Sequence, residues 1–221
     1  MDNFTYAHND TSEGERESVT AKFNKAKLSE NIQKLRESAF ARGIPTADDE
    51  TIGFLKNLVL AVQPQNILEL GTATGISGAV MLKACPTAKL TTVERDQNFY
   101  KEACENFCNL GLSGRVNAIF GDAGEVIQTL DGTYDFIFLD CAKVQYVKYL
   151  PTLKKLLKSG GVLLADDVLL YGWLTGQTPV PPKRKMLYMH LKEYVDAVTC
   201  DEELSTTILN IGDGIALSVK L

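Results

Sequence analysis

Two apolar runs in the sequence end in carboxylates, and a lysine follows one of them. Asp140 comes directly after the run 136–139, and Lys143 stands three positions later. Asp166 and Asp167 end the run "VLLA" in the same way. Carboxylate oxygens suit hard cations such as Mg²⁺, Mn²⁺ or Ca²⁺, and crowded carboxylates raise one another's pKa unless a cation intervenes. The pattern predicts a divalent metal site at the three aspartates, with an amine beside it that can exchange a proton.

A glycine-containing segment, "ELGTATGIS", predicts a cofactor site. Gly71 follows a short apolar run, but the segment lacks the full GxGxxG pattern. Glu94 stands about 20 residues further on, where an acid can accept hydrogen bonds from ribose hydroxyls. Glu69 places negative charge where the pyrophosphate of NAD would lie, which favours a positively charged ligand such as S-adenosylmethionine. The ammonium of that ligand would meet Glu69, and its carboxylate would meet Ser77 and the start of the next helix.

Apolar runs alternate with helix-like segments, and this alternation determines how those residues are positioned. It predicts a doubly wound, Rossmann-like α/β fold with a seven-stranded, mostly parallel sheet, N-terminal helices and an antiparallel C-terminal hairpin strand. Strands are expected at 66–70, 89–94, 115–120, 134–140, 162–167, 204–211 and 214–221. Helices are expected at 21–42, 50–62, 97–110, 146–157 and 183–198, with two more after "GTATG" and "GDAGE".

In such a sheet, ligands bind beyond the carboxyl ends of the strands, at the point where the strand order reverses. Each of the first five expected strands ends in or next to an acid, so these acids would meet at one edge of the sheet. Asp122, after the third strand, would lie near the adenine of the cofactor. Asp140 belongs to both the cofactor-binding and the metal-binding group.

Composition restricts the class of protein. The chain has 221 residues and a net charge of -5, which gives no general attraction to nucleic acid or to an anionic membrane. Its five cysteines form no regular framework, and no apolar run approaches the roughly 20 residues needed to span a bilayer. We therefore expect a cytoplasmic protein that does not bind membranes. We expect a polar tail at 1–20 and one domain at 21–221, divided into N-terminal helices (21–62) and a Rossmann-like core (63–221).

The combined motifs resemble the metal-dependent class I O-methyltransferases, which include catechol and caffeoyl-CoA O-methyltransferases. The resemblance rests on "ILELGTATGISG", "TTVERD", "GDA", "YDFIFLDCAKVQYVKYL", "SGGVLLADDVLLYG" and "GDGIALSVK". It implies that Asp140, Asp166 and Asp167 bind the metal and that Lys143 is the general base. It further implies that Glu94 binds the ribose, that Asp122 and Ala123 contact the adenine, and that the enzyme is a homodimer.

Four positions depart from the family pattern. Asp167 stands where Asn is usual. Its extra negative charge should tighten the binding of a divalent cation but reduce the cation's power to acidify a bound hydroxyl. Ile76 stands where Tyr is frequent. Cys141 and Ala142 replace bulkier residues that line a catechol pocket, which predicts a wider pocket.

A finer resemblance concerns the substrate. "AKVQY" and "PPKRKMLYMHLKEYVDAV" are similar to the bacterial tRNA 5-hydroxyuridine methyltransferases, which form 5-methoxyuridine at the wobble position of the anticodon loop. A compact basic cluster, Lys183, Arg184 and Lys185, could bind RNA phosphates, with Lys25 and Lys27 adding to it. 5-Hydroxyuridine in tRNA is therefore the leading expected substrate.

Other readings remain open from the sequence. The main alternative is a small catechol or phenol, which presents a similar pair of oxygens. The more distant alternatives are a non-catalytic nucleotide- or metal-binding protein and an NAD-dependent oxidoreductase. Three clustered aspartates beside a lysine argue against both of these.

Overall fold

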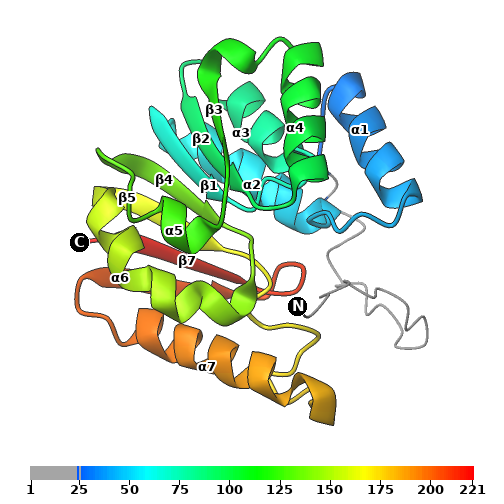
Figure 1. Cartoon of the computed structure of the whole chain (residues 1–221). Coiled ribbons are helices and arrows are strands. Elements are labelled where there is room, and N and C mark those ends of the chain that lie inside the picture. Colours follow the sequence, from blue (N-terminus) through cyan, green and yellow to red (C-terminus); the bar gives the residue numbers. More distant parts are fainter. Residues whose placement is uncertain (1–23, 25) are drawn as a thin grey trace.

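A single mixed sheet lies between two layers of helices in the computed structural model, which describes residue 24 and residues 26–221 (Figure 1). The strands are β1 (Asn66–Leu70), β2 (Lys89–Glu94), β3 (Val116–Phe120), β4 (Tyr134–Leu139), β5 (Leu157–Ala165), β6 (Leu204–Leu209) and β7 (Ile215–Lys220). The helices are α1 (Glu30–Ala41), α2 (Asp49–Val62), α3 (Ile76–Ala84), α4 (Gln97–Asn109), α5 (Ala123–Val126), α6 (Tyr146–Leu156) and α7 (Lys185–Thr199). Short 3-10 helices are η1 (Ser113–Arg115), η2 (Lys143–Gln145) and η3 (Pro182–Arg184). Within these described residues, no helix is long and apolar enough to cross a membrane.

The order of the strands is β3-β2-β1-β4-β5-β7-β6. The five strands from β3 to β5 pair in parallel, and β7 pairs antiparallel with both β5 and β6. The predicted fold class is confirmed. The chain moves outward from β1 to β3 and then returns to β4, so the order reverses between β1 and β4, and a ligand is expected beyond these two strand ends.

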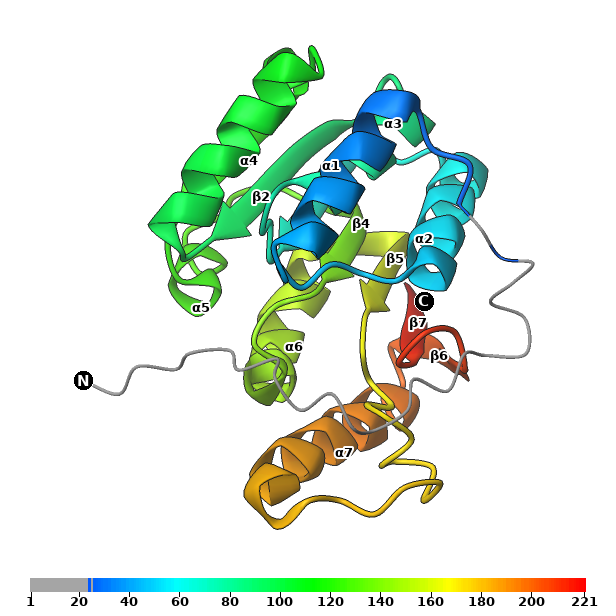
Figure 2. The ribbon, with the colours of Figure 1, turned by 90° about the vertical axis from the view of Figure 1, so that its right-hand side faces the viewer.

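Alternating side chains of the strands supply two apolar cores. Ile67 and Phe136 face α1–α4, whereas Leu68 and Ile137 face α5–α7. Figures 1 and 2 show the two groups of helices on opposite sides of the sheet. The two consecutive residues named in β1, and the two named in β4, are therefore all buried although they point to opposite faces. This is expected for a parallel sheet that is covered on both faces.

Several element boundaries differ from those expected. The first helix begins at Glu30 rather than at residue 21, and within it Phe40 is 80% exposed whereas Ile32 is buried. Asp48 caps α2 by accepting a 2.7 Å hydrogen bond from the N–H of Thr51. The expected tail at 1–20, residues 21–23 of the first expected helix, and Lys25 lie outside the described residues.

The fifth strand starts earlier and ends earlier than expected. It ends at Ala165; Asp166 still donates its N–H to the carbonyl of Leu139 at 3.1 Å, and the backbone then turns. Asp167 has a positive φ of 57°, which is incompatible with a continuing strand. Both aspartates therefore lie just beyond the sheet, in the connection that follows it.

Candidate active site

Gly71 allows the ends of β1 and β4 to approach each other. Its φ is +104°, and a Cβ atom at this position would lie 1.8 Å from the carbonyl oxygen of Asp140. The N–H of Asp140 in turn donates to the carbonyl of Leu70 at 2.9 Å. Only glycine satisfies both the backbone conformation and the contact. The glycine loop and Asp140 are therefore held together where the strand order reverses.

Glu94 fixes the glycine loop from β2. Its Oε2 accepts the N–H of Ala73 at 2.8 Å, and its Oε1 accepts the N–H of Asp96 at 2.8 Å. Ala73 has a φ of 44°, a conformation that needs such support in a residue with a side chain. Glu94 thus shapes the loop, and it remains at the strand end where a ribose is expected.

Glu69 lies beneath the loop with no exposed surface. Ser77 Oγ donates to one of its carboxyl oxygens, and Thr92 Oγ1 donates to the other, both at 2.6 Å. Burial raises the pKa of Glu69 to about 7, although these two hydrogen bonds oppose the shift. The Ser77 hydroxyl is thus directed to Glu69, an arrangement that the sequence reading did not anticipate.

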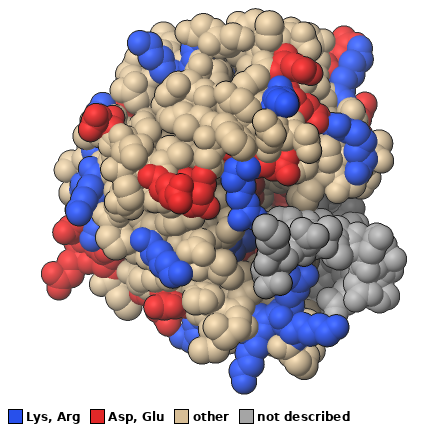
Figure 3. Space-filling view, viewed as in Figure 1, with Lys and Arg blue, Asp and Glu red and all other residues tan. Residues whose placement is uncertain are grey.

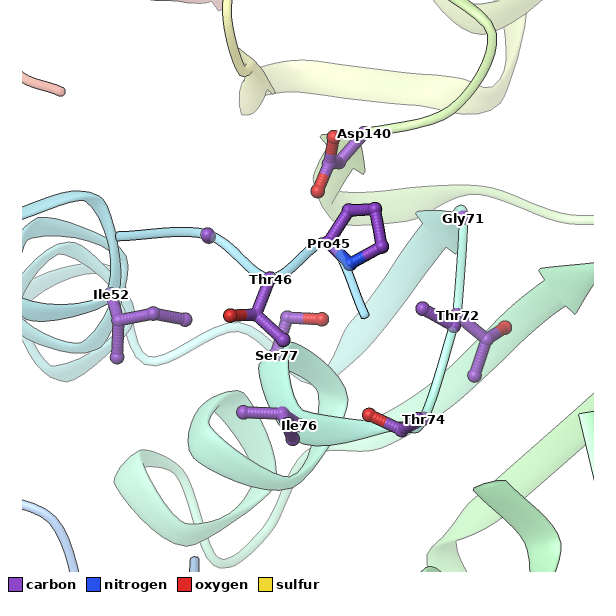
Figure 4. Close-up of a pocket in the computed structure, with 11 residues that line it drawn as sticks. Pro45, Thr46, Ile52, Gly71, Thr72, Thr74, Ile76, Ser77 and Asp140 are labelled. Carbon is purple, nitrogen blue, oxygen red and sulfur yellow. The ribbon is translucent and has the colours of Figure 1, made fainter. Parts of the chain in front are cut away.

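A pocket opens above this loop. Pro45 and Thr46, from the connection between α1 and α2, line it together with Ser77 and Asp140 (Figure 4). The full lining is Pro45, Thr46, Ala47, Ile52, Gly71, Thr72, Ala73, Thr74, Ile76, Ser77 and Asp140. Gly71, Ser77 and Asp140 of the predicted cofactor residues therefore meet in one pocket. The sequence showed the connection only as a helix break, so its part in the lining was missed.

The remaining predicted cofactor residues lie outside this lining. Glu69 is beneath it, and Glu94 is behind the loop. Asp122 accepts the N–H of Gly124 at 2.8 Å and so caps α5, which begins at Ala123. Asp122 and Ala123 follow the end of β3, and β3 lies on the side of β2 that faces away from β1.

Lys143 joins the ends of β4 and β5. Its Nζ lies 2.9 Å from Oδ1 of Asp140 and 2.8 Å from Oδ2 of Asp167. Asp166 is 2% exposed, and its Oδ1 accepts the N–H of Asp167 at 2.8 Å. The predicted metal ligands and the predicted base thus form one cluster, but the ammonium group lies between two of the three carboxylates.

The chemistry and the geometry of these side chains bear differently on a divalent cation. The donor set is entirely carboxylate oxygen, which suits Mg²⁺, Mn²⁺ or Ca²⁺. Among the residues that the structure describes, however, no three acidic, His or Cys side chains are gathered around one point as metal ligands. In this arrangement the ammonium of Lys143 pairs with Asp140 and Asp167, and the assignment of these carboxylates as metal ligands stays a prediction.

The electrostatics of the cluster follow from burial and crowding. Burial, together with the charges of Asp167 and Asp140, raises the pKa of Asp166 well above its usual range. Burial alone would lower the pKa of Lys143, but the charges of Asp140, Asp167 and Asp166 outweigh it and raise that pKa well above its ordinary value. The ammonium form of Lys143 is therefore strongly favoured here.

The turn between β6 and β7 holds the connection that carries Asp167. The carbonyl of Asp213 accepts the N–H groups of Leu169 and Leu170 at 2.9 and 3.0 Å, and the carbonyl of Gly214 accepts that of Val168 at 2.9 Å. The carboxyl group of Asp213 accepts the N–H of Tyr171. The sequence indicated this "GDG" segment only as a hairpin turn, because nothing in it shows which loop it faces.

These contacts maintain an unfavourable backbone. Asp167, Leu170 and Tyr171 have positive φ values of 57°, 34° and 50°. Such values cost free energy in residues with side chains and persist where neighbouring groups determine them. Burial and the nearby charge of Asp167 raise the pKa of Asp213 to about 6, which agrees with its place beside the acidic cluster.

The predicted basic cluster is exposed. Lys183 and Arg184 belong to η3, and Lys185 begins α7. Figure 3 shows Lys and Arg side chains gathered over the start of α7. Burial and the charges of Asp213 and Asp167 raise the pKa of Tyr171, and the positive charges of Arg184 and Lys143 oppose this shift. Lys27 lies beside α2, where its backbone carbonyl accepts a hydrogen bond from the ammonium group of Lys56.

Comparison with known proteins identifies the family. A family model described as O-methyltransferase matches residues 18–221. This chain belongs to that family. It is 26% identical over 205 residues to the caffeoyl-CoA O-methyltransferase of Populus kitakamiensis, with 87% of each chain covered. The predicted enzyme class, an S-adenosylmethionine-dependent O-methyltransferase, is confirmed.

Solved structures are similar to this chain over most of its length. A Staphylococcus aureus protein, provisionally named a caffeoyl-CoA O-methyltransferase, matches with a TM-score of 0.80 and 31% identity, covering 88% of this chain and 93% of its own. TomG from Streptomyces achromogenes, an O-methyltransferase of tomaymycin synthesis solved with S-adenosylmethionine, matches at a TM-score of 0.78 and 23% identity, with 88% and 91% covered. These relatives are named for small molecules, and they lend no support to the finer resemblance to the tRNA enzymes.

Proposed function

We propose that this O-methyltransferase transfers a methyl group from S-adenosylmethionine to a hydroxyl of a small phenolic or catechol-type molecule. One observation carries the proposal: Asp140 lines the pocket above the glycine loop and also binds Lys143, so a cofactor site and a charged site share one residue. The name of the Populus relative, caffeoyl-CoA O-methyltransferase, refers to a phenolic acyl thioester and supports this substrate class.

The cofactor would lie along the ends of β1, β2 and β3. In this proposal Glu94 binds the ribose, and Asp122 and Ala123 contact the adenine. Gly71 and Ser77 lie next to the methionine end, with Asp140 opposite. Because both oxygens of Glu69 are already hydrogen-bonded beneath the loop, Glu69 would attract the ammonium through its charge and would hold Ser77 in place.

Methyl transfer is an in-line displacement. A lone pair of the substrate oxygen forms the new O–C bond while the S–C bond breaks, and the sulfur keeps the bonding pair in S-adenosylhomocysteine. The substrate hydroxyl must lose its proton. Lys143 is the general base expected from the family, but its raised pKa favours the ammonium form. We propose that this ammonium stabilises the negative substrate oxygen, while the adjacent carboxylate of Asp140 or Asp167 accepts the proton.

A divalent cation remains part of the proposal on the chemistry of its ligands. Asp140, Asp166 and Asp167 would hold Mg²⁺, Mn²⁺ or Ca²⁺ if Lys143 moved away from the carboxylates. A bound cation would supply Lewis acidity that lowers the pKa of the substrate hydroxyl. The steps assigned above to the side chains do not depend on it.

The proposal is tested by supplying labelled S-adenosylmethionine with a panel of catechols and phenols, with Mg²⁺ or with a chelator. Asp140→Ala should abolish transfer, whereas Asp131→Ala, which changes an exposed aspartate before β4, should not. Failure of the wild-type protein to bind the cofactor in calorimetry, or to label any phenol, would exclude the proposed activity.

A second candidate substrate is 5-hydroxyuridine in the anticodon loop of tRNA. The specific observation that favours it is the exposed cluster of Lys183, Arg184 and Lys185 in η3 and at the start of α7. Phosphate contacts by such residues give affinity that falls steeply with salt. Exposed bases in a single-stranded loop would need no extraction from a duplex.

The two candidates can be separated with one variant. Changing Lys183, Arg184 and Lys185 to Ser should leave methylation of a catechol unchanged. It should lower the affinity for RNA and make that affinity less dependent on salt concentration. The matched control changes three exposed lysines elsewhere, Lys148, Lys155 and Lys192, to Ser. Equal loss of RNA binding in both triple variants would show that only net charge matters and would remove the basic cluster from the argument.

A further inference from the structure

Tyr146 links the two strand ends that carry the acidic cluster. Its side chain is 0% exposed, and its hydroxyl lies 2.9 Å from the carbonyl oxygen of Leu139, the last residue of β4. The same hydroxyl lies 3.4 Å from the carbonyl oxygen of Asp166. One donor is thus directed at the residue before Asp140 and at the residue before Asp167.

The same side chain also faces the lysine. Tyr146 begins α6 immediately after η2, the short helix that begins at Lys143. The Nζ atom of Lys143 lies 6.0 Å from the centre of the Tyr146 ring, at the outer limit of a cation–π contact. The ring therefore lies beneath the ammonium, while the hydroxyl anchors the start of α6 to β4 and β5.

We propose that Tyr146 is a positioning residue that sets the separation of Lys143, Asp140 and Asp167 for methyl transfer. The proposal rests on the function proposed above for these three side chains. Lys143 is on η2, Asp140 follows β4 and Asp167 follows β5. The Tyr146 hydroxyl contacts the backbone of both strand ends from the helix that continues η2. Misplacement of reacting groups by about 1 Å can reduce a rate by roughly a hundredfold, so a single anchoring hydroxyl can have a large effect.

The neighbouring Tyr194 of α7 provides a matched control. It is also 0% exposed, and its ring lies against that of Tyr146 in an edge contact, with centroids 5.3 Å apart. Its hydroxyl, however, has no hydrogen-bond partner in the described structure. Tyr146→Phe and Tyr194→Phe therefore each remove one buried hydroxyl oxygen from adjacent rings. Only the hydroxyl of Tyr146 is hydrogen-bonded in the described structure.

The experiment compares both variants with the wild-type protein in three measurements. These are kcat and KM with a phenolic substrate, cofactor affinity by calorimetry, and crystal structures that give the distance from Lys143 Nζ to Asp167 Oδ2. We expect Tyr146→Phe to lower kcat about 10- to 100-fold with cofactor affinity unchanged, and to lengthen the 2.8 Å separation. Tyr194→Phe should retain both kcat and the separation.

A lower unfolding temperature in Tyr146→Phe with unchanged kcat and an unchanged separation would assign the hydroxyl to stability alone and would overturn the proposal. The structures decide the matter separately from the chemistry. If the wild-type protein methylates no phenol, the proposed substrate class fails. The separation of Lys143 and Asp167 in the two variants then still shows whether Tyr146 sets it.

Discussion

The Nζ atom of Lys143 lies 2.8 Å from Oδ2 of Asp167, so an ion pair joins the connection after β4 to the connection after β5. The pair is partly buried, with 18% of the lysine side chain and 33% of the aspartate side chain exposed. Lys143 also binds Asp140 in the same way. The cation at the centre of this site is thus provided by the chain itself, and this observation leads to the first two predictions.

Replacing Lys143 should greatly reduce methyl transfer. Lys143→Met removes the ammonium that faces the substrate oxygen, and we expect kcat to fall by about 100-fold or more while cofactor affinity is retained. Steady-state kinetics and calorimetry measure the two effects. Lys148→Met, at an exposed lysine of α6, is the control and should match the wild-type protein. A Lys143→Met enzyme with full kcat would remove the lysine from the reaction.

Divalent cations should compete with Lys143. Because the ammonium lies between Asp140 and Asp167, Mg²⁺, Mn²⁺ or Ca²⁺ should bind Lys143→Met more tightly than the wild-type protein. Titration calorimetry gives both affinities, and removal of the cation with a chelator should reverse any thermal stabilisation. Adding Asp167→Asn to the Lys143→Met variant should lower the affinity for the cation again. Equal affinity in the wild-type protein and in Lys143→Met would place the cation elsewhere.

The stability of the protein should depend on the ionisation of Glu69. Its pKa in the folded protein is about 7, above the ordinary 4.5, so folding favours the protonated carboxyl group. The resulting stability is fully present below pH 4.5 and is lost as the pH rises through 7. The shift corresponds to about 3 kcal/mol at most.

Urea unfolding from pH 4.5 to 8 measures this effect. Glu69→Gln cannot ionise, and its stability should change less across the interval than that of the wild-type protein. Glu105→Gln, at an exposed position of α4, should follow the wild-type curve. Identical pH profiles for the wild-type protein and Glu69→Gln would show that Glu69 does not titrate in this range.

Gly71 should tolerate no side chain. In Gly71→Ala, the methyl group would lie 1.8 Å from the carbonyl oxygen of Asp140, so β1 and β4 must separate where the cofactor is expected. We expect loss of folded protein or of cofactor binding. Gly111→Ala separates crowding from backbone strain, because Gly111 has a φ of +69° but no atom within 4 Å of its would-be Cβ. The control should cost about 1–2 kcal/mol in urea unfolding. Similar costs in the two variants would attribute the effect of Gly71→Ala to strain alone.

The sequence predicted the fold well because apolar runs and turns are local signals. β1 and β2 have the expected bounds, and the acids at the ends of β4 and β5 meet as expected, since neighbouring parallel strands end at one edge. The roles proposed for those acids remain to be tested. Periodicity shows which residues share a helical face but not whether another element covers that face, and Phe40 of α1 is 80% exposed.

Contacts between distant segments could not be predicted in the same way. The hydroxyl of Ser77 is directed to Glu69, and Pro45 lines the pocket, because of how separate segments pack. The position of Lys143 between two carboxylates depends on side-chain geometry that spacing alone does not define. For the same reason, Tyr146 was recognised only as part of a family motif.

The turn of Asp213 and Gly214 also affects when the site can assemble. These residues hold the connection after β5, yet they follow every other residue of the site in the chain. During synthesis, the glycine loop, Asp140 and Lys143 emerge before this turn. Until the turn has left the ribosome, the connection that carries Asp167 lacks the groups that fix its backbone. A nascent chain would therefore contain Asp140, Asp166 and Asp167 without their final arrangement.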